Sequence, residues 1–180
     1  MKILFFSDIH GIVDNLECIK KLEEKENFDK IVVLGDLYYQ GPTFDNSKKI
    51  NSLEVGNFLM NYHDKLICMR GNCDSDVDIK KSDFPVCSGV SLIHTDGLDI
   101  YITHGNEYNI NNDIKFNRKG ILVYGHEHYP FIQKKLGMTF INVGSISLPR
   151  RGSEPSYGIY YDKEFFIYGI SGKLIDKINL

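Results

Sequence analysis

Carboxylate, amide and imidazole side chains recur in this sequence directly after short apolar runs. The first run, Ile3–Phe6, is followed by Ser7-Asp8-Ile9-His10-Gly11. Four more segments of this kind follow: Gly35-Asp36, Gly71-Asn72-Cys73-Asp74, His104-Gly105 and Gly125-His126-Glu127-His128. Glycine lets the backbone turn tightly and approach other groups closely, so each segment is typical of a sharp turn that carries a polar side chain. The sequence therefore predicts polar groups at the ends of several strands.

Seven of these side chains are of types that coordinate metal ions. They are Asp8, His10, Asp36, Asn72, His104, His126 and His128. Gathered at the carboxyl ends of strands in an open sheet, they would be costly to bury unless they were paired or coordinated metal. Seven ligands exceed the four of a closed tetrahedral site and suit two ions that share a ligand. Asp36 is the candidate for the shared ligand, because a carboxylate has two oxygens and this one follows a run expected at the centre of a sheet.

The mixed oxygen and nitrogen ligand set favours transition-metal ions. We expect two divalent ions, with Mn²⁺ first, Zn²⁺, Fe or Ni²⁺ as alternatives, and Mg²⁺ less favoured because of the imidazoles. Two ions held roughly 3.5–4 Å apart clamp the attacking and the leaving oxygen of a displacement at phosphorus. The chemistry predicted for this site is therefore hydrolysis of a phosphate ester. Cys73 is expected beside the ligands and is not counted among them.

Hydrophobic patterning predicts the elements that must position these groups. Short apolar runs without alternation are typical of strands covered on both faces, and they occur at Ile3–Phe6, Ile31–Leu34, Leu66–Met69 and Ile121–Tyr124. Helical patterns lie between the first three runs. One is expected to start at a capping box formed by Asp14 and Glu17, and the next at Asn51 or Ser52. The N-terminal half therefore predicts a parallel sheet with helical crossovers.

The second half of the sequence favours antiparallel strands. Asp96-Gly97 separates the runs Val90–Ile93 and Ile100–Thr103, which predicts a hairpin. Three C-terminal strands are expected at Tyr157–Tyr161, Glu164–Tyr168 and Lys173–Ile178. We predict one domain, residues 1–180, that is a mixed α/β protein with two sheets, each covered by helices.

Composition and charge narrow the range of functions. The chain has 180 residues, is 42% hydrophobic and has 21 basic against 24 acidic residues, a net charge of −3. This balance disfavours broad electrostatic binding to nucleic acid. The apolar runs are too short for a signal peptide or a membrane span, so we expect no membrane association and a cytoplasmic location. The spacing of the four cysteines (Cys18, Cys68, Cys73 and Cys87) matches neither a zinc motif nor a disulfide framework, which favours reduced thiols.

The motif blocks, in this order, resemble those of the calcineurin-like metallophosphoesterase superfamily. They are DxH, GD, GN followed by an acidic residue, a lone His-Gly and GHxH, and Asn142-Val143-Gly144-Ser145 also resembles a later block. The small size and the segment Gly71–Asp74 are most similar to the small bacterial and archaeal phosphodiesterases of the YfcE type. The resemblance implies two mixed β-sheets packed as a sandwich and flanked by helices, in layers α/β/β/α.

The resemblance also implies an assignment of ligands and a mechanism. Asp8, His10, Asp36 and His128 would hold one ion, and Asp36, Asn72, His104 and His126 would hold the other. A hydroxide that bridges the ions would attack phosphorus in line. Asp36, Asn72, Cys73 and His104 are the residues expected to be catalytic. Many relatives have histidine at the position of Cys73, and because a thiol is a weak hydrogen-bond donor, Cys73 favours diesters over substrates with poor leaving groups.

The expected function is hydrolysis of a small phosphodiester by a dinuclear-metal enzyme. One alternative is a phosphomonoesterase or protein phosphatase. Another is a non-catalytic scaffold like the small retromer subunit, a branch of the superfamily with a degraded site, and the complete ligand set argues against it. The physiological substrate and the oligomeric state stay open, and a homo-oligomer is compatible with the aromatic C-terminal strands.

Several other polar residues are interpreted as structural or left open. His63 and His94 are expected at the surface. Arg70 is expected to brace the site through a carboxylate. Arg150 and Arg151 could bind a substrate phosphate or form a solvated loop. The loops Tyr38–Lys49 and Glu107–Arg118 are expected to control access to the site.

Overall fold

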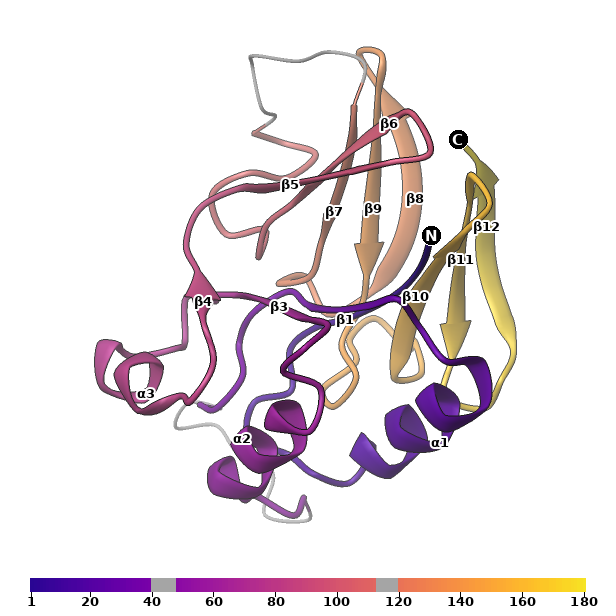
Figure 1. Cartoon of the computed structure of the whole chain (residues 1–180). Coiled ribbons are helices and arrows are strands. Elements are labelled where there is room, and N and C mark those ends of the chain that lie inside the picture. Colours follow the sequence, from indigo (N-terminus) through magenta and orange to yellow (C-terminus); the bar gives the residue numbers. More distant parts are fainter. Residues whose placement is uncertain (40–47, 113–119) are drawn as a thin grey trace.

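The computed structural model describes residues 1–39, 48–112 and 120–180 and contains two mixed β-sheets packed face to face (Figure 1). The strands are β1 (Lys2–Phe6), β2 (Lys30–Val33), β3 (Leu66–Met69), β4 (Val86–Cys87), β5 (Ser91–Thr95), β6 (Leu98–Ile102), β7 (Ile121–Tyr124), β8 (Pro130–Lys135), β9 (Met138–Val143), β10 (Ser156–Tyr161), β11 (Glu164–Gly169) and β12 (Leu174–Asn179). The helices are α1 (Leu16–Glu26), α2 (Ser52–Met60) and α3 (Asp76–Lys81). The prediction of two mixed sheets is confirmed.

The larger sheet has seven strands in the order β12-β11-β10-β1-β2-β3-β4. Strands β1 to β4 run parallel, with α1, α2 and α3 in the successive connections, and β10 to β12 continue the sheet antiparallel from β1. The smaller sheet has the order β5-β6-β7-β9-β8, in which β6, β7 and β9 are parallel. Parallel strands end at the same edge, so β1, β2 and β3 carry the residues that follow them to one side of the sheet.

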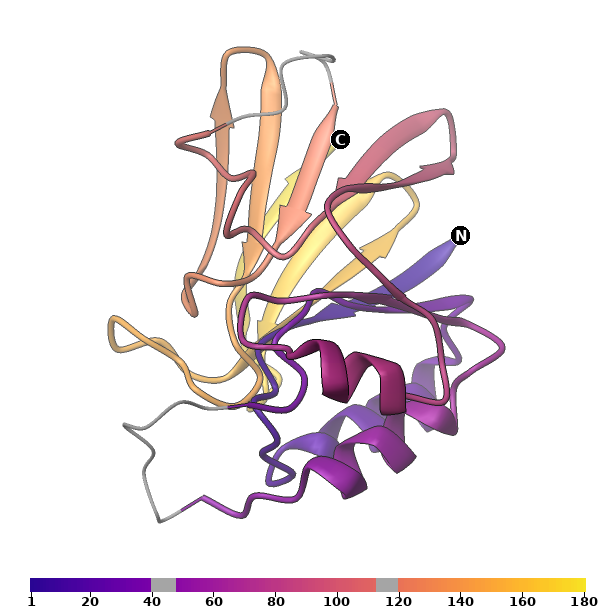
Figure 2. The same cartoon turned by 90° about the vertical axis from the view of Figure 1, so that its left-hand side faces the viewer.

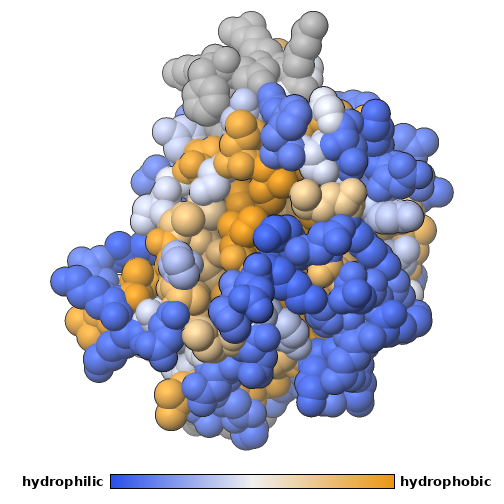
Figure 3. Space-filling view, viewed as in Figure 1, coloured by the Kyte–Doolittle hydropathy of each residue, from blue (hydrophilic) through white to orange (hydrophobic). Residues whose placement is uncertain are grey.

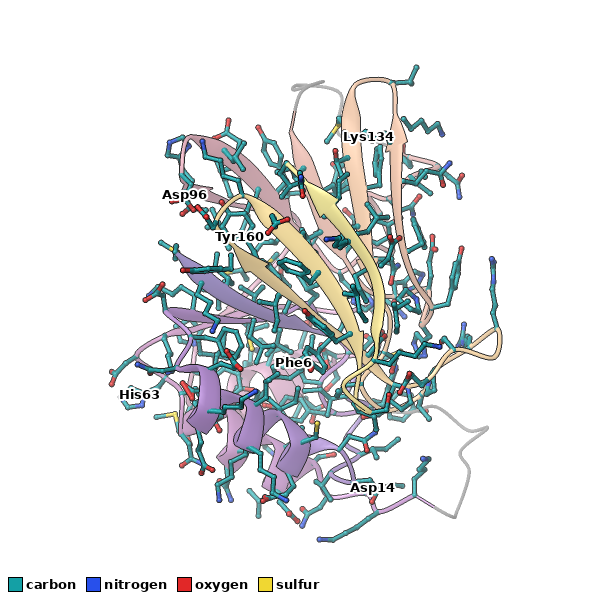
Figure 4. All side chains as sticks on the ribbon, turned by 90° about the vertical axis from the view of Figure 1, so that its right-hand side faces the viewer. Phe6, Asp14, His63, Asp96, Lys134 and Tyr160 are labelled. Atoms are coloured by element: carbon teal, nitrogen blue, oxygen red, sulfur yellow. The ribbon has the colours of Figure 1, made fainter. Side chains whose placement is uncertain are left out.

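Two apolar layers cover the two faces of the seven-stranded sheet. Ile3 and Phe5 of β1 face the five-stranded sheet, where the Phe5 ring lies 5.3 Å from that of Phe165. Leu4 and Phe6 alternate with them and pack against the helices. Figure 4 shows Phe6 between the seven-stranded sheet and the helices. Burial on both faces explains why β1 is an apolar run without alternation.

The helices in the described residues all lie on one side of the molecule, against the seven-stranded sheet (Figure 2). The outer face of the five-stranded sheet carries a cluster that includes Tyr101, Leu122 and Phe140, with Tyr108 and Ile110 from the loop after β6 packed on it. Figure 3 shows apolar side chains among hydrophilic ones on the side of the molecule where β5 lies in Figure 1. The expectation that helices cover both sheets is therefore not met within the described residues, and loop residues pack there instead.

Some boundaries differ from the predictions for local reasons. The predicted capping box is wrong: α1 begins after Asn15, which makes no capping hydrogen bond, and the Asp14 carboxylate accepts from the Lys49 N–H at 3.4 Å. The cap at Asn51 is confirmed, because its side chain accepts the N–H of Glu54 at 3.1 Å. The hairpin turn at Asp96-Gly97 is also confirmed, with positive φ at both residues as a type I′ turn requires.

Four elements were absent from the sequence-based prediction: α3, β4, β8 and β9. β9 is buried along its whole length and β4 has only two residues, so neither shows a clear period. In the described part of the chain, no helix combines the length and apolar character that a bilayer crossing requires.

Candidate metal centre

The structure brings all seven predicted ligands to one edge, where strands of both sheets end. The seven-stranded sheet supplies Asp8 and His10 after β1, Asp36 after β2, and Asn72 after β3. The five-stranded sheet supplies His104 after β6, and His126 and His128 after β7. The site therefore spans the boundary between the two sheets.

The first cluster consists of four buried residues, Asp8, His10, Asp36 and His128. One ligand atom from each lies within 4.8 Å of the others. His128 Nε2 is 3.2 Å from His10 Nε2 and 3.2 Å from Asp8 Oδ1, and His10 Nε2 is 3.6 Å from Asp36 Oδ2. Two ligands of one ion, each bonded at about 2.0–2.2 Å, lie roughly 3–3.5 Å apart. The spacing in this cluster fits one divalent ion.

Asp8 provides an independent test of that fit. Its Oδ2 accepts the His126 N–H at 2.9 Å, but its Oδ1 is fully buried and receives no hydrogen bond from the described residues. An unpaired carboxylate oxygen costs free energy in the interior, and a coordinated cation would satisfy it. This oxygen faces His128 Nε2 at 3.2 Å inside the cluster, where a shared cation would satisfy both atoms, so the residues present suit a metal ion.

The second cluster consists of Asp36, Asn72, His104 and His126. His104 Nε2 lies 3.0 Å from Asn72 Oδ1, 3.3 Å from His126 Nδ1 and 3.4 Å from Asp36 Oδ2. The same Asp36 oxygen is therefore near His10 in one cluster and His104 in the other. Asn72 is exposed and His126 half-buried, so this cluster is the more open of the two.

Backbone carbonyl groups orient three of the imidazole rings. The Nδ1 atoms of His104 and His128 lie 2.7 Å from the carbonyl oxygens of Leu34 and Leu148, and that of His10 contacts Tyr39 O. A ring that donates from Nδ1 leaves its Nε2 lone pair for a metal ion. His126 differs, because it faces the second cluster through Nδ1.

Five of the seven residues have a left-handed backbone. The φ angles are 56° at Asp8, 53° at His10, 52° at Asp36, 64° at His126 and 62° at His128. Such angles are uncommon outside glycine, although Asp and His tolerate them better than most residues, and they cluster at functional sites. The turns are held by backbone hydrogen bonds such as Asp8 N–H to Gly35 O at 3.0 Å and His10 N–H to Asp36 O at 2.8 Å.

Two glycines are required by close approach of other groups. A Cβ at Gly71 would collide with the backbone amide and carboxylate of Asp36, and a Cβ at Gly125 would lie 2.6 Å from Asp8 Oδ2 and collide with Ser7. Gly71 therefore allows the loops after β2 and β3 to approach each other, and Gly125 allows the ends of β7 and β1 from the two sheets to meet.

The charges of the site shift the pKa values of its groups. Burial raises the pKa of Asp8, but its contact with His128 and the charges of His128 and His104 together outweigh burial, and the pKa lies below its ordinary value. Burial raises the pKa of Asp36, but His104, the Cys73 N–H and the charge of His10 together hold it well below its usual range. Burial opposes protonation of His104, yet Asp36 and Asp8 raise its pKa to about 9. Burial and the neighbouring His104 lower the pKa of His126. Without metal the carboxylates are therefore ionised and His104 is cationic at neutral pH.

Cys73 lies beside the second cluster, as expected. Its N–H donates to Asp36 Oδ1 at 2.8 Å, and its sulfur is 3.3 Å from the side-chain nitrogen of Asn72. Burial and the charge of Asp36 raise the pKa of the thiol to about 12, so it stays protonated at neutral pH. All four cysteines are free.

Sequence reasoning missed the buried carboxylate of Asp74. Its Oδ1 accepts the N–H groups of Leu37 and Tyr38 at 2.7 and 3.3 Å, and its Oδ2 accepts the N–H of Gly71 at 2.9 Å. It thereby ties the loop of Asp36 to the loop of Asn72. Burial raises the pKa of Asp74 despite these hydrogen bonds. The signal available in the sequence was an acidic residue directly after a ligand motif.

The segment after β9 also supports the site. The Ser145 hydroxyl donates to Asp8 O at 2.8 Å, and the Asn142 amide donates to Gly125 O at 2.6 Å. Both residues are fully buried. The block Asn142–Ser145 was noticed as a resemblance, but its role as a brace needed the structure.

His63 and His94, predicted at the surface, lie outside the site. His63 is exposed near the end of α2 and pairs with Asp64 at 2.9 Å (Figure 4), and His94 contacts Asp99 at 2.8 Å. Neither approaches the seven ligands through any contact in the described residues.

The arginines differ in what they contact. Arg70 pairs with the Asp76 carboxylate at 2.7 Å and also donates to the backbone carbonyl of Asp74. Arg151 lies 3.8 Å over the Tyr129 ring. The Arg150 side chain is exposed and makes no hydrogen bond or ion pair with the described residues, while its N–H donates to His128 O at 2.8 Å. The access loops Tyr38–Lys49 and Glu107–Arg118 fall partly outside the described residues.

Comparison with known proteins gives consistent results. The calcineurin-like phosphoesterase superfamily domain matches residues 1–164. The phosphodiesterase YfcE of Escherichia coli K12 is 32% identical over 159 residues, which cover 88% of this chain and 86% of the relative. The probable metallophosphoesterase YsnB of Bacillus subtilis is 26% identical over 166 residues, 88% of this chain and 83% of the relative.

Solved structures share the fold. The structure of Yfce, described as a phosphoesterase from E. coli, matches with a TM-score of 0.93 and 29% identity over 99% of each chain. Vacuolar Protein Sorting 29 from Cryptosporidium parvum matches with a TM-score of 0.66 and 18% identity over 99% of this chain and 98% of the other. The second match is a likeness of fold alone.

Proposed function

Because the chain belongs to the calcineurin-like phosphoesterase superfamily, we propose that it is a dinuclear-metal phosphodiesterase that hydrolyses a small phosphodiester. Asp8, His10, Asp36 and His128 would hold one divalent ion, and Asp36, Asn72, His104 and His126 the other. We propose Mn²⁺ as the first metal to test, because the ligands mix oxygen and nitrogen.

The observation that carries the proposal is the position of Asp36. One of its oxygens lies 3.6 Å from His10 Nε2 and 3.4 Å from His104 Nε2, between the two clusters. Its other oxygen accepts the Cys73 N–H, which fixes the carboxylate in this orientation. A single carboxylate directed at both clusters is what two neighbouring cations require.

The residues of the site would divide the work between holding ions and handling the substrate. Divalent ions bound here would polarise the phosphoryl oxygens and lower the pKa of a bound water. The carboxylates of Asp8 and Asp36 supply negative charge, and the carbonyl-oriented rings of His10, His104 and His128 keep Nε2 directed inward. The open side at Asn72 and His126 is where a substrate phosphate would enter.

The protonation state of Cys73 supports a diester rather than a monoester as the substrate. Its pKa of about 12 keeps it a neutral thiol, which is a weak hydrogen-bond donor. A phosphomonoester brings a second negative charge, and a neutral thiol at this position does not compensate it. A phosphodiester carries a single negative charge and therefore makes a smaller demand for positive charge at this position.

A matrix of metals and substrates tests the proposal. Protein stripped of metal is reconstituted with Mn²⁺, Zn²⁺, Ni²⁺, Fe²⁺ or Mg²⁺ and assayed on bis(p-nitrophenyl) phosphate and on p-nitrophenyl phosphate. We expect hydrolysis of the diester that requires a metal and exceeds hydrolysis of the monoester. Failure to hydrolyse either compound with any of the five metals would refute the proposal, and a preference for the monoester would correct it to a phosphomonoesterase.

Asp36→Asn should nearly abolish this activity. The substitution keeps the shape of the side chain but removes the charge shared by the two clusters, so we expect a fall in kcat on the order of 10² to 10³-fold. Metal content, measured by mass spectrometry of the native protein, should fall below two ions per chain. Asp64→Asn at the exposed partner of His63 is the matched control and should keep both values.

A further inference from the structure

A polar cavity of about 310 Å³ adjoins the second cluster. Asn72 lines it, and the amide oxygen of the same residue lies 3.0 Å from His104 Nε2. The other side chains around it come from three separate segments and include Arg70, Ser88, Thr103, Asn106 and Glu107. A group attached to a phosphorus atom at the metal centre could therefore extend directly into this space.

The lining of the cavity contains polar side chains and glycines only. In the described residues it has no aromatic and no aliphatic side chain. Pockets for apolar or aromatic groups are lined mostly by hydrophobic and aromatic residues, and bases are held by stacking on aromatic rings. The cavity therefore offers little to a nucleobase, an aryl group or an acyl chain.

Three of the lining side chains are available for a ligand. Ser88, Asn106 and Glu107 are exposed, and their side chains make no hydrogen bond to the described residues. Thr103 and Arg70 are already engaged, the first with Gly89 O at 2.8 Å and the second with Asp76 and Asp74. The free groups are a hydroxyl, an amide and a carboxylate, which pair with hydroxyl groups as donors and acceptors.

The charge of the cavity disfavours a second anionic group on the substrate. The guanidinium of Arg70 is paired with the Asp76 carboxylate at 2.7 Å, whereas Glu107 has no cationic partner in the described residues. A second phosphate or carboxylate would meet the uncompensated charge of Glu107. A neutral alcohol would not.

Building on the function proposed above, we propose that this cavity binds one alcohol group of the phosphodiester and that this group is a small neutral polyol. Hydroxyl groups of the polyol would contact Asn106, Glu107 and Ser88 while the phosphate lies over the second cluster. The substrate class is then a phosphodiester of a polyhydroxy alcohol.

Binding of three phosphate esters with the same charged group tests the inference. Glycerol 1-phosphate, propyl phosphate and phenyl phosphate are compared by calorimetry on the metal-loaded protein, prepared without glycerol, and as competitive inhibitors of diester hydrolysis. Two added hydrogen bonds predict that glycerol 1-phosphate binds roughly tenfold more tightly than propyl phosphate. Phenyl phosphate should gain nothing over propyl phosphate.

Variants test whether the residues of the cavity cause the preference for glycerol 1-phosphate. Asn106→Ala and Glu107→Gln should each lower the ratio of glycerol 1-phosphate to propyl phosphate affinity by roughly fivefold. Asn57→Ala on α2 and Glu24→Gln on α1, exposed and far along the chain from the cavity, are matched controls that should keep the wild-type ratio. An altered ratio in these controls would overturn the assignment to this cavity.

The outcomes separate this inference from the proposed function. Protein that hydrolyses bis(p-nitrophenyl) phosphate but binds the three esters equally, or prefers phenyl phosphate, overturns the polyol assignment and leaves the phosphodiesterase intact. Protein that prefers glycerol 1-phosphate in calorimetry, and loses the preference in Asn106→Ala, supports the cavity even where no diester is hydrolysed.

Discussion

Metal and proton compete at the residues of this site. In the metal-free protein the pKa of His104 is about 9, because Asp36 and Asp8 favour its charged form. A coordinating imidazole must be neutral, so an ion that binds His104 near neutral pH displaces a proton. The same pairing makes the stability of the metal-free protein depend on pH.

The sign of that dependence follows from the direction of the shift. The pKa of His104 is raised from 6.5 to about 9 in the folded state, so its contribution is complete below pH 6.5 and is lost as the pH rises through 9. We expect the free energy of unfolding in EDTA to decrease between pH 7 and 9, by on the order of 3 kcal/mol at most. Urea unfolding followed by circular dichroism at pH 7, 8 and 9 measures it.

His104→Gln provides the comparison for this pH profile. Glutamine does not titrate, so between pH 7 and 9 the variant should lose clearly less stability than the wild type does. His126 does not obscure the result, because its pKa is lowered and it titrates below pH 6.5. Equal slopes in the wild type and the variant would show that His104 is not the group responsible.

At the scale of elements, the site depends on loops that are joined to one another. Asp74 accepts N–H groups from the loop after β2 and from the loop after β3, so the positions of Asp36 and Asn72 are coupled. These two residues belong to the second cluster. We interpret Asp74 as a positioning residue for that half of the site.

Asp74→Asn should weaken the second ion more than the first. Asparagine has one acceptor oxygen, so one of the two loops loses its anchor and leaves a buried N–H unsatisfied, at a cost of about 1–3 kcal/mol. Calorimetric titration with Mn²⁺ at 25 °C should show one strong site retained and one weakened by about tenfold or more.

Asp83→Asn is the control, because Asp83 is exposed and lies just after α3. A variant that melts earlier yet binds both ions as the wild type does would mean that Asp74 serves stability alone.

Much of this arrangement could be predicted from the sequence, for identifiable reasons. Apolar runs such as Ile3–Phe6 mark strands buried on both faces, and the family and the two mixed sheets are confirmed. The prediction that these polar residues gather at one place required only that parallel strands end at the same edge of a sheet. The assignment of individual ligands to two ions stays a prediction.

Other features depend on contacts that a local pattern does not encode. The strand Met138–Val143 is buried throughout and shows no period, and α1 begins after Asn15 without a side-chain cap of the kind that the Asp14 pattern predicted. The role of Asp74 arises from N–H groups that are 36 or 37 residues away in the sequence. Such long-range hydrogen bonds become visible only when the loops are placed.

At the scale of the molecule, polar contacts join the two sheets at the candidate metal centre and also away from it. At the opposite side Asp96, in the β5–β6 turn, accepts the Tyr160 hydroxyl at 2.8 Å, and the two residues lie side by side in Figure 4. At the candidate metal centre the seven-stranded sheet supplies four of the predicted ligands and the five-stranded sheet three. Ions bound between them would link the two layers of the fold.

Metal removal should therefore lower the thermal stability of the whole molecule. A ligand that binds only the folded state adds about 2.7 kcal/mol per site at a concentration 100 times its Kd. A chain of this length gains roughly 2–4 °C in Tm for each kcal/mol, so one such site corresponds to about 5–10 °C. We expect calorimetry to give a higher Tm with Mn²⁺ than with EDTA. Asp36→Asn should lose most of that difference, because it removes the ligand common to both clusters.

Asp64→Asn is the control and should show the full wild-type difference. An identical Tm with Mn²⁺ and with EDTA would mean that the two sheets are held together without bound ions, and that the predicted ligands do not bind Mn²⁺ in the folded protein.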